Sequence, residues 1–246
     1  MHLVVIPFCI SAVGNVRTAD FSTLLNVLTS IPFLVLGVSG ITSIGDWRGA
    51  RRLPFAAFVL SLIPVGLGSI FYHWSPSTGH LLLDRLPISI CLAAFACAVV
   101  NEYFQTSWGS VLLLPAVLFS AVSVLYWYFT AIEGRENLVP YAAVQGCAAG
   151  FSALVVFTRP GRREGIAGLR WALAIYAAAR IIELFQQDIY RTVGTDIGHP
   201  MKHLLVCLAA FLVVRTLGDG GSRQPEAGIV PLETAPPASP FASGQY

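Results

Sequence analysis

Charged residues are scarce in this sequence. Asp, Glu, Lys and Arg together make up 11% of the 246 residues, whereas a typical soluble domain contains about 25%. A chain so poor in charge cannot cover a water-facing surface, which excludes an ordinary soluble globular protein. Hydrophobic residues account for 55% of the chain, and its mean hydropathy is +0.70. Lipid is therefore predicted to be the main solvent of this protein.

The low net charge and the lack of a CxxC pair argue against two further classes of protein. The net charge is only +2, and the basic residues do not cluster with aromatic residues, so nothing indicates a nucleic-acid partner. The five cysteines lie in apolar stretches and form no CxxC pair, which is typical of small buried hydrophobes rather than of a disulfide framework. Lysine is almost missing, since Lys202 is the only one in the chain.

Seven apolar runs are long enough, or nearly so, to cross a bilayer as helices of about 20 residues. An all-α bundle of seven transmembrane helices is therefore predicted within residues 1–217, with spans near 21–43, 54–73, 80–101, 109–130, 138–158, 168–187 and 200–217. Residues 3–13 are apolar but too short to span, and either an interfacial segment or a cleaved signal fits them. Residues 218–246 are rich in Pro, Gly, Ser and Ala, which predicts a disordered tail.

The arginines predict the orientation, because cytoplasmic loops carry an excess of Lys and Arg. Three arginines fall on one side of the predicted bundle, namely Arg17, Arg135 and Arg191. Eight fall on the other side, namely Arg48, Arg51, Arg52, Arg159, Arg162, Arg163, Arg215 and Arg223. We therefore expect the N-terminus outside and the tail in the cytoplasm. The preference for arginine over lysine suggests a GC-rich bacterial genome, and the expected location is the bacterial inner membrane.

Polar side chains at membrane depth are costly and mark functional sites. Several predicted spans carry such residues near one end, and the predicted topology brings them all to the outer half of the bundle. They are Ser69, His73, Asp84, Glu183, His199 and His203, with Asp20 and Asn26 at the start of the first span. So many ionisable or nucleophilic groups at one level indicate a site.

The histidines in this set favour a metal centre. His199 and His203 are four residues apart and share one face of a helix, and His73 offers a third imidazole from another span. Zinc binds imidazole nitrogen readily, and a catalytic zinc commonly has three protein ligands and a water. His80 is the residue to examine as a fourth ligand, which would make the zinc structural instead.

Simpler roles remain open for the other polar residues. Asp84 can form a plain ion pair with Arg85 at a helix start, where a carboxylate is favoured anyway. Ser69 lies in the small-residue run GLGS, which can serve only to let two helices approach closely. Glu183 and Asp188 can be solvated loop residues.

Three segments resemble the alkaline ceramidase family. GLGSIFYHWSPSTGHLLLDRLPISI is similar to the motif in which a Ser precedes a His by four residues and an LLDELPM-like segment follows. GHPMKHLLVCLAA is similar to the GHTLKHLLAAL form of bacterial members, and ADFSTLLNVLTSIPFLVLG to the first helix. The resemblance covers about residues 18–217 and implies seven helices around a zinc site.

This resemblance also implies roles. His73, His199 and His203 would bind zinc, and Ser69 and Asp84 would stand beside the metal and its water. The expected function is zinc-dependent intramembrane hydrolysis of the amide bond of ceramide, or of a related lipid amide or ester. The acidic cluster that holds calcium in eukaryotic members is reduced here to Asp20, which argues against calcium. The alternative is a seven-helix receptor or lipid-binding protein with a structural zinc.

Overall fold

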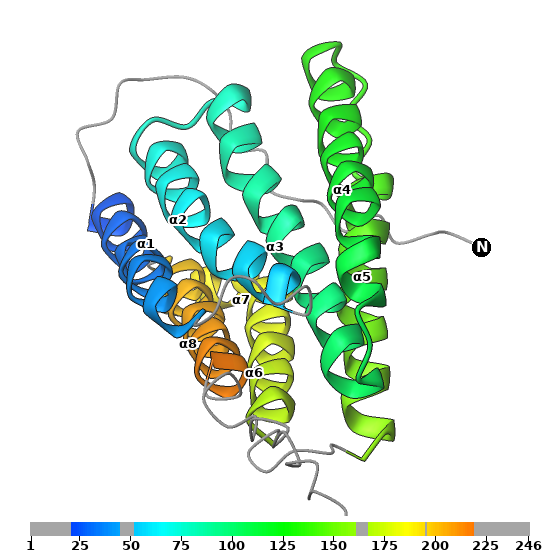
Figure 1. Ribbon diagram of the computed structural model, residues 1–246. Coiled ribbons are helices and arrows are strands. Elements are labelled where there is room, and N and C mark those ends of the chain that lie inside the picture. The colour runs from blue at the N-terminus through cyan, green and yellow to red at the C-terminus, as the bar shows by residue number, and fades with distance from the viewer. Residues whose placement is uncertain (1–20, 45–51, 161–166, 195, 219–246) are drawn as a thin grey trace, which may run out of the picture.

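The computed structural model describes residues 21–44, 52–160, 167–194 and 196–218. Within these ranges the chain is helical and contains no strand (Figure 1). The elements are α1 (Phe21–Gly40), the short 3-10 helix η1 (Ile41–Ser43), α2 (Leu53–Trp74), α3 (Thr78–Phe104), α4 (Trp108–Ile132), α5 (Val139–Thr158), α6 (Ala167–Leu184), α7 (Gln186–Val193) and α8 (Gly198–Gly218). Each of the seven predicted spans corresponds to one of the long helices.

Six of the described helices are long and apolar enough to cross a membrane, namely α1 with η1, α2, α3, α4, α5 and α8. The remaining long helix, α6, has 18 residues and carries Arg170, Arg180 and Glu183. Length and composition therefore support a helical membrane bundle, with one span fewer than the seven that the sequence predicts. The helix α6 does not qualify as a span because it carries three charged residues.

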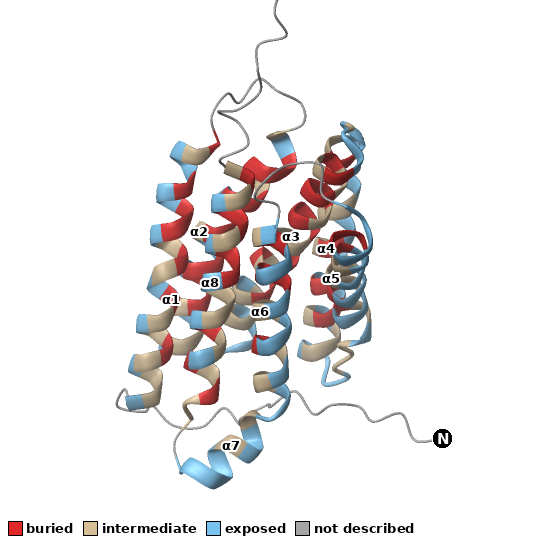
Figure 2. Cartoon of the chain, turned by 90° about the horizontal axis from the view of Figure 1, so that it is seen from below, coloured by how far each residue is buried: buried red, intermediate tan, exposed pale blue. Residues whose placement is uncertain are grey.

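The distribution of apolar side chains fits a lipid environment. Large hydrophobic residues are exposed along the outward faces of the helices, as α4 illustrates with Val111, Leu114, Phe119, Val122 and Phe129. Buried residues face the interior of the bundle, where α1, α2, α3, α6 and α8 contribute to one main core (Figure 2). Exposed apolar patches on this scale are unusual in soluble monomers and mark a membrane-facing surface.

The helices α2 and α3 cross at very close range at Gly68. A Cβ atom built on Gly68 would lie 2.1 Å from the carbonyl oxygen of Leu83 and 3.0 Å from the Cα atom of Asp84. Only a residue without a side chain permits this approach. Gly68 therefore fixes how near α3, with Asp84, comes to Ser69 on α2.

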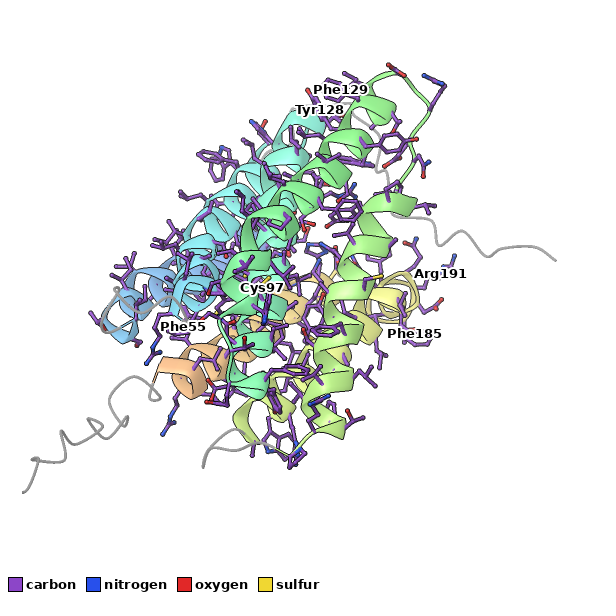
Figure 3. All side chains as sticks on the ribbon, turned by 45° about the vertical axis from the view of Figure 1, so that its right-hand side comes forward. Phe55, Cys97, Tyr128, Phe129, Phe185 and Arg191 are labelled. Carbon is purple, nitrogen blue, oxygen red and sulfur yellow. The ribbon has the colours of Figure 1, made fainter. Side chains whose placement is uncertain are left out.

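A short amphipathic helix that the sequence analysis did not predict lies between α6 and α8. The sixth span was expected to continue to residue 187, but α6 ends at Leu184 and α7 begins at Gln186. Gly194, with a φ of 77°, ends α7 in the left-handed region that glycine adopts without strain. Figure 2 shows α7 at one end of the bundle, and Figure 3 shows Phe185 and Arg191 projecting outward from this part of the chain.

Several predictions fall on residues outside the described ranges. They concern the apolar segment 3–13, the candidate Asp20, five of the eight arginines on the predicted cytoplasmic side, and the tail from residue 219 onward. The four cysteines in the described part, Cys91, Cys97, Cys147 and Cys207, are free thiols.

Candidate metal centre

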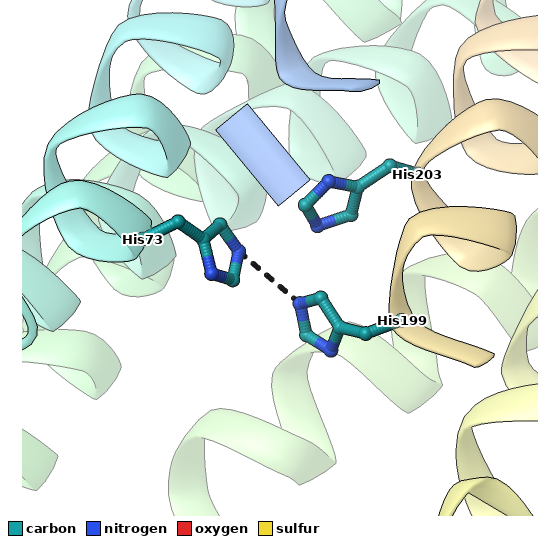
Figure 4. A group of neighbouring side chains, drawn as sticks. All are labelled: His73, His199 and His203. Atoms are coloured by element: carbon teal, nitrogen blue, oxygen red, sulfur yellow. Dashed lines mark hydrogen bonds between the residues drawn. The ribbon is translucent and has the colours of Figure 1, made fainter. Parts of the chain in front are cut away.

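Three histidines from two helices face one another (Figure 4). His73 lies in the last turn of α2, and His199 and His203 lie in the first two turns of α8. One possible ligand atom of each falls within 4.8 Å of those of the other two. His203 is buried and the other two are half-buried. The cluster that the spacing predicted is thus present in the structure.

The distance between His73 and His199 fits a pair of metal ligands. The Nε2 atoms of His73 and His199 are 3.2 Å apart. In a tetrahedral site with Zn–N bonds of about 2.0–2.1 Å, two ligand nitrogens lie about 3.3–3.4 Å apart. Three imidazoles at this spacing can hold a metal ion, and within the described residues they are grouped with no fourth His, Cys, Asp or Glu.

The local sequence explains the position of each ring. The i, i+4 spacing of His199 and His203 stacks both rings on one face of α8. Pro200 is accommodated in the first turn of α8, where a missing backbone N–H costs no intrahelical hydrogen bond. The last span was predicted to begin at residue 200, but α8 begins at Gly198, so both rings are held by a regular helix.

The outer nitrogen of each α8 histidine contacts an oxygen that sequence reasoning had not singled out. His203 Nδ1 lies 3.2 Å from Ser30 Oγ and 3.3 Å from Thr29 Oγ1, both on α1. His199 Nδ1 lies 3.4 Å from Gln186 Oε1 at the start of α7. The sequence offered one signal for Thr29 and Ser30. They are two hydroxyl residues within an apolar run, and polar groups at membrane depth are costly and mark functional sites.

Ser69 belongs to the same cluster. Its side chain is buried, and its Oγ lies 2.9 Å from Ser30 Oγ. Ser30 therefore contacts both a candidate metal ligand and a candidate catalytic residue. Asn26 is buried one turn before Ser30, and its Oδ1 atom has no hydrogen-bond partner within the described part of the chain.

Asp84 lies on α3 across from Gly68, which directly precedes Ser69. Its neighbour Arg85 is buried, and its guanidinium lies 4.1 Å from the ring centroid of Trp127 and 5.5 Å from that of Tyr141. Arg85 therefore packs against aromatic rings of α4 and α5.

Glu183 is part of an ion-pair cluster beside the histidines. It contacts Arg180 on α6 and Lys202 on α8, with 3.2 Å between Lys202 Nζ and Glu183 Oε1. Lys202 Nζ also lies 3.5 Å from His199 Nε2. Lys202 stands between His199 and His203 in the sequence, and this position was the signal that could have placed it beside the histidines.

Two other candidates lie away from the cluster. His80 is exposed, and its Nδ1 contacts the backbone oxygen of Ser75, so it is not grouped with the three histidines. Asp188 is an exposed residue of α7 that pairs with Arg191 at 3.2 Å, which agrees with the solvated role considered for it.

Comparison with known proteins identifies the family. A family model described as Ceramidase matches residues 16–216, which is most of the chain. The chain belongs to the Ceramidase family. No curated protein and no solved structure is significantly similar to it. Membership in the Ceramidase family implies a hydrolase that acts on the amide bond of a lipid such as ceramide, in keeping with a histidine cluster that can hold a metal ion.

Proposed function

We propose that this protein is a zinc-dependent intramembrane hydrolase that cleaves the amide bond of ceramide or of a related lipid. The observation that carries the proposal is the trio of His73, His199 and His203, whose ligand atoms lie within 4.8 Å of one another. Family membership supports the reaction class. The donor set supports zinc, because three neutral imidazoles suit that ion well.

Three histidines also favour catalysis over a structural role. A structural zinc is closed by four protein ligands, whereas a catalytic zinc keeps one position open. His80, the suggested fourth ligand, contacts Ser75 instead, so no observation favours the receptor alternative. Zinc held by the trio would supply Lewis acidity, which lowers the pKa of water and polarises a carbonyl group.

The other residues of the site would move and hold protons. Asp84 would accept a proton from the attacking water and then donate it to the nitrogen of the leaving amine, as general base and acid. Ser69 would hydrogen-bond either the attacking water or the oxyanion that develops on the carbonyl oxygen. Glu183 would hold Lys202 beside His199, since the two charged groups are 3.2 Å apart.

The topology proposed for this enzyme has seven spans. In addition to the six helices that qualify by composition, α6 would cross the membrane with its three charged residues paired or near its ends. The positive-inside rule places the tail in the cytoplasm and the histidines in the outer half. A site at that depth suits a substrate that never leaves the bilayer.

Metal analysis combined with a lipid-hydrolysis screen tests the proposal. We expect about one zinc per purified chain and release of fatty acid from at least one lipid amide or ester. The His73→Ala variant, which lacks the ligand from α2, should lose both. Bound zinc without turnover of any lipid in the screen would favour the receptor alternative, and absence of metal from the wild type would contradict the proposal.

A further inference from the structure

The α1 hydroxyl groups at the site are restricted in what they can donate. A Ser or Thr hydroxyl carries one proton and two acceptor lone pairs. Ser30 Oγ lies 2.7 Å from the backbone oxygen of Asn26. Thr29 Oγ1 lies 2.8 Å from the backbone oxygen of Leu25 and 3.2 Å from that of Asn26. Carbonyl oxygens only accept, and they are the nearest partner of each hydroxyl, which favours donation of its single proton to the backbone.

This preference indicates which ring nitrogen of His203 carries the hydrogen. Ser30 Oγ and Thr29 Oγ1 both lie within hydrogen-bonding distance of His203 Nδ1. With their protons given to the backbone, both oxygens accept there, and His203 Nδ1 carries a hydrogen that it shares between them. In a neutral imidazole the other nitrogen, Nε2, then has its lone pair free, and the trio needs that lone pair to hold a metal.

The same preference indicates which hydroxyl group donates in the hydrogen bond between Ser30 and Ser69. With the Ser30 proton given to the Asn26 carbonyl, Ser69 is the donor across the 2.9 Å contact between the two hydroxyl groups. Ser30 is then fully used, with one donated proton and two accepted ones. Ser69 then has only lone pairs left for other partners, which suits acceptance of a hydrogen from water better than donation to an oxyanion.

Gln186, at the start of α7, holds His199 in the same Nδ1–H tautomer. Gln186 Nε2 lies 3.3 Å from each carboxylate oxygen of Asp196. Because a carboxylate accepts only, the amide nitrogen of Gln186 must face Asp196, and its oxygen faces His199 Nδ1 at 3.4 Å. His199 Nδ1 then donates, and its Nε2 lone pair also faces the centre.

We propose that Thr29 and Ser30 are positioning residues that hold His203 as the Nδ1–H tautomer and make Ser69 a hydrogen-bond acceptor toward the attacking water. This inference rests on the proposed metal centre and deepens it, because it chooses between the two roles left open for Ser69. Outer hydrogen bonds of this kind fix ligand histidines, and their loss typically weakens metal binding by about 10–100-fold.

The test measures zinc affinity by competition with a chelator in detergent. Thr29→Val combined with Ser30→Ala should bind zinc about 10–100-fold more weakly than the wild type. The conservative pair Thr29→Ser and Ser30→Thr should restore most of the affinity. Ser152→Ala is the matched control, because Ser152 is an equally buried serine that donates to the backbone oxygen of Ala148 at 2.8 Å. It is not grouped with the histidines.

A second measurement reads the tautomer directly and does not depend on the folding of a variant. In ¹⁵N-histidine spectra of the metal-free wild type, the His203 signals, assigned with His203→Ala, should show a protonated Nδ1. A protonated Nε2 would overturn the inference, and so would unchanged zinc affinity in the double variant. Absence of zinc from the wild type would contradict the proposed function instead, and the spectra would still decide the tautomer.

Discussion

At the scale of single residues, the site is defined by which atoms can donate and which can only accept. Three imidazoles present ligand nitrogens to one point, with His73 and His199 only 3.2 Å apart. The hydroxyl groups of Thr29 and Ser30 contact carbonyl oxygens of their own helix and also lie beside His203 Nδ1. In a medium without water, unsatisfied polar groups are costly, so this arrangement is strongly specified.

The first prediction concerns the most buried ligand. His203→Ala should lose most of the roughly one zinc expected per chain, because two remaining imidazoles hold the ion poorly. Metal analysis of the purified variant checks this. His80→Ala is the control and should keep its zinc, since His80 contacts Ser75 instead of the cluster. Full retention of zinc in His203→Ala would remove His203 from the site.

The second prediction concerns proton transfer by Asp84. Asp84→Asn keeps the size of the side chain but cannot take a proton near neutral pH. Lipid hydrolysis should fall by about 10²–10⁴-fold, while zinc content and Tm change little. Asp188→Asn, at an exposed ion pair on α7, should leave all three unchanged. Hydrolysis that survives in Asp84→Asn would exclude Asp84 as the general base.

At the scale of elements, the crossing of α2 and α3 determines how near the backbone at Asp84 comes to α2. Ser69 and His73 lie on α2 and Asp84 lies on α3. The crossing point is Gly68, where the backbones approach so closely that a methyl group would overlap the carbonyl group of Leu83. The small-residue run thus permits the close approach of α2 and α3, which is the simpler role considered for it, and Ser69 lies in the same run.

The third prediction follows from this contact. Gly68→Ala should push α2 and α3 apart, lower stability by about 1–3 kcal/mol and reduce hydrolysis as Asp84 moves away. Gly146→Ala on α5 is the matched control, because nothing lies within 4 Å of the added Cβ. That variant should be neutral or slightly more stable. Tm values of both proteins in detergent make the comparison, and an unchanged Tm for Gly68→Ala would contradict the close packing.

At the scale of the whole molecule, the helices surround a polar site with an apolar exterior. Large hydrophobic side chains cover the outside, and the charged groups Arg85, Glu183 and Lys202 are turned inward or paired. The short helix α7 closes the end of the bundle at which α8 begins and contributes Gln186 to the site. This arrangement fits an enzyme whose substrate arrives from the membrane.

The fourth prediction concerns orientation. The excess of arginines on one side predicts that the C-terminal tail is cytoplasmic and the histidines lie near the outer surface. A reporter that works only in the cytoplasm should be active when fused after Gly221, and one that works only outside should be inactive there. The opposite pattern would place the metal centre on the inner face.

The sequence alone determined a large part of this description. Long apolar runs can only be buried in lipid or in a core, so their lengths predicted the long helices closely. His199 and His203 share one helix face wherever α8 is placed, because their spacing is local. His73 and Asp84 were identified through topology, since helices that end and begin at one membrane surface bring their termini to one level.

Only the tertiary structure decided the rest. The contacts of Ser30 with His203 and of Lys202 with Glu183 join residues far apart in the chain, and no periodicity reports such distances. The helix α7 is too short and polar to produce a hydropathy signal. Arg85, next to Asp84 in sequence, lies over Trp127 because packing, and not sequence neighbourhood, determines the partner of a buried charge. The direction of a hydrogen bond can be assigned only when every neighbouring donor and acceptor is known. These neighbours come from several helices and are brought together only in the folded bundle.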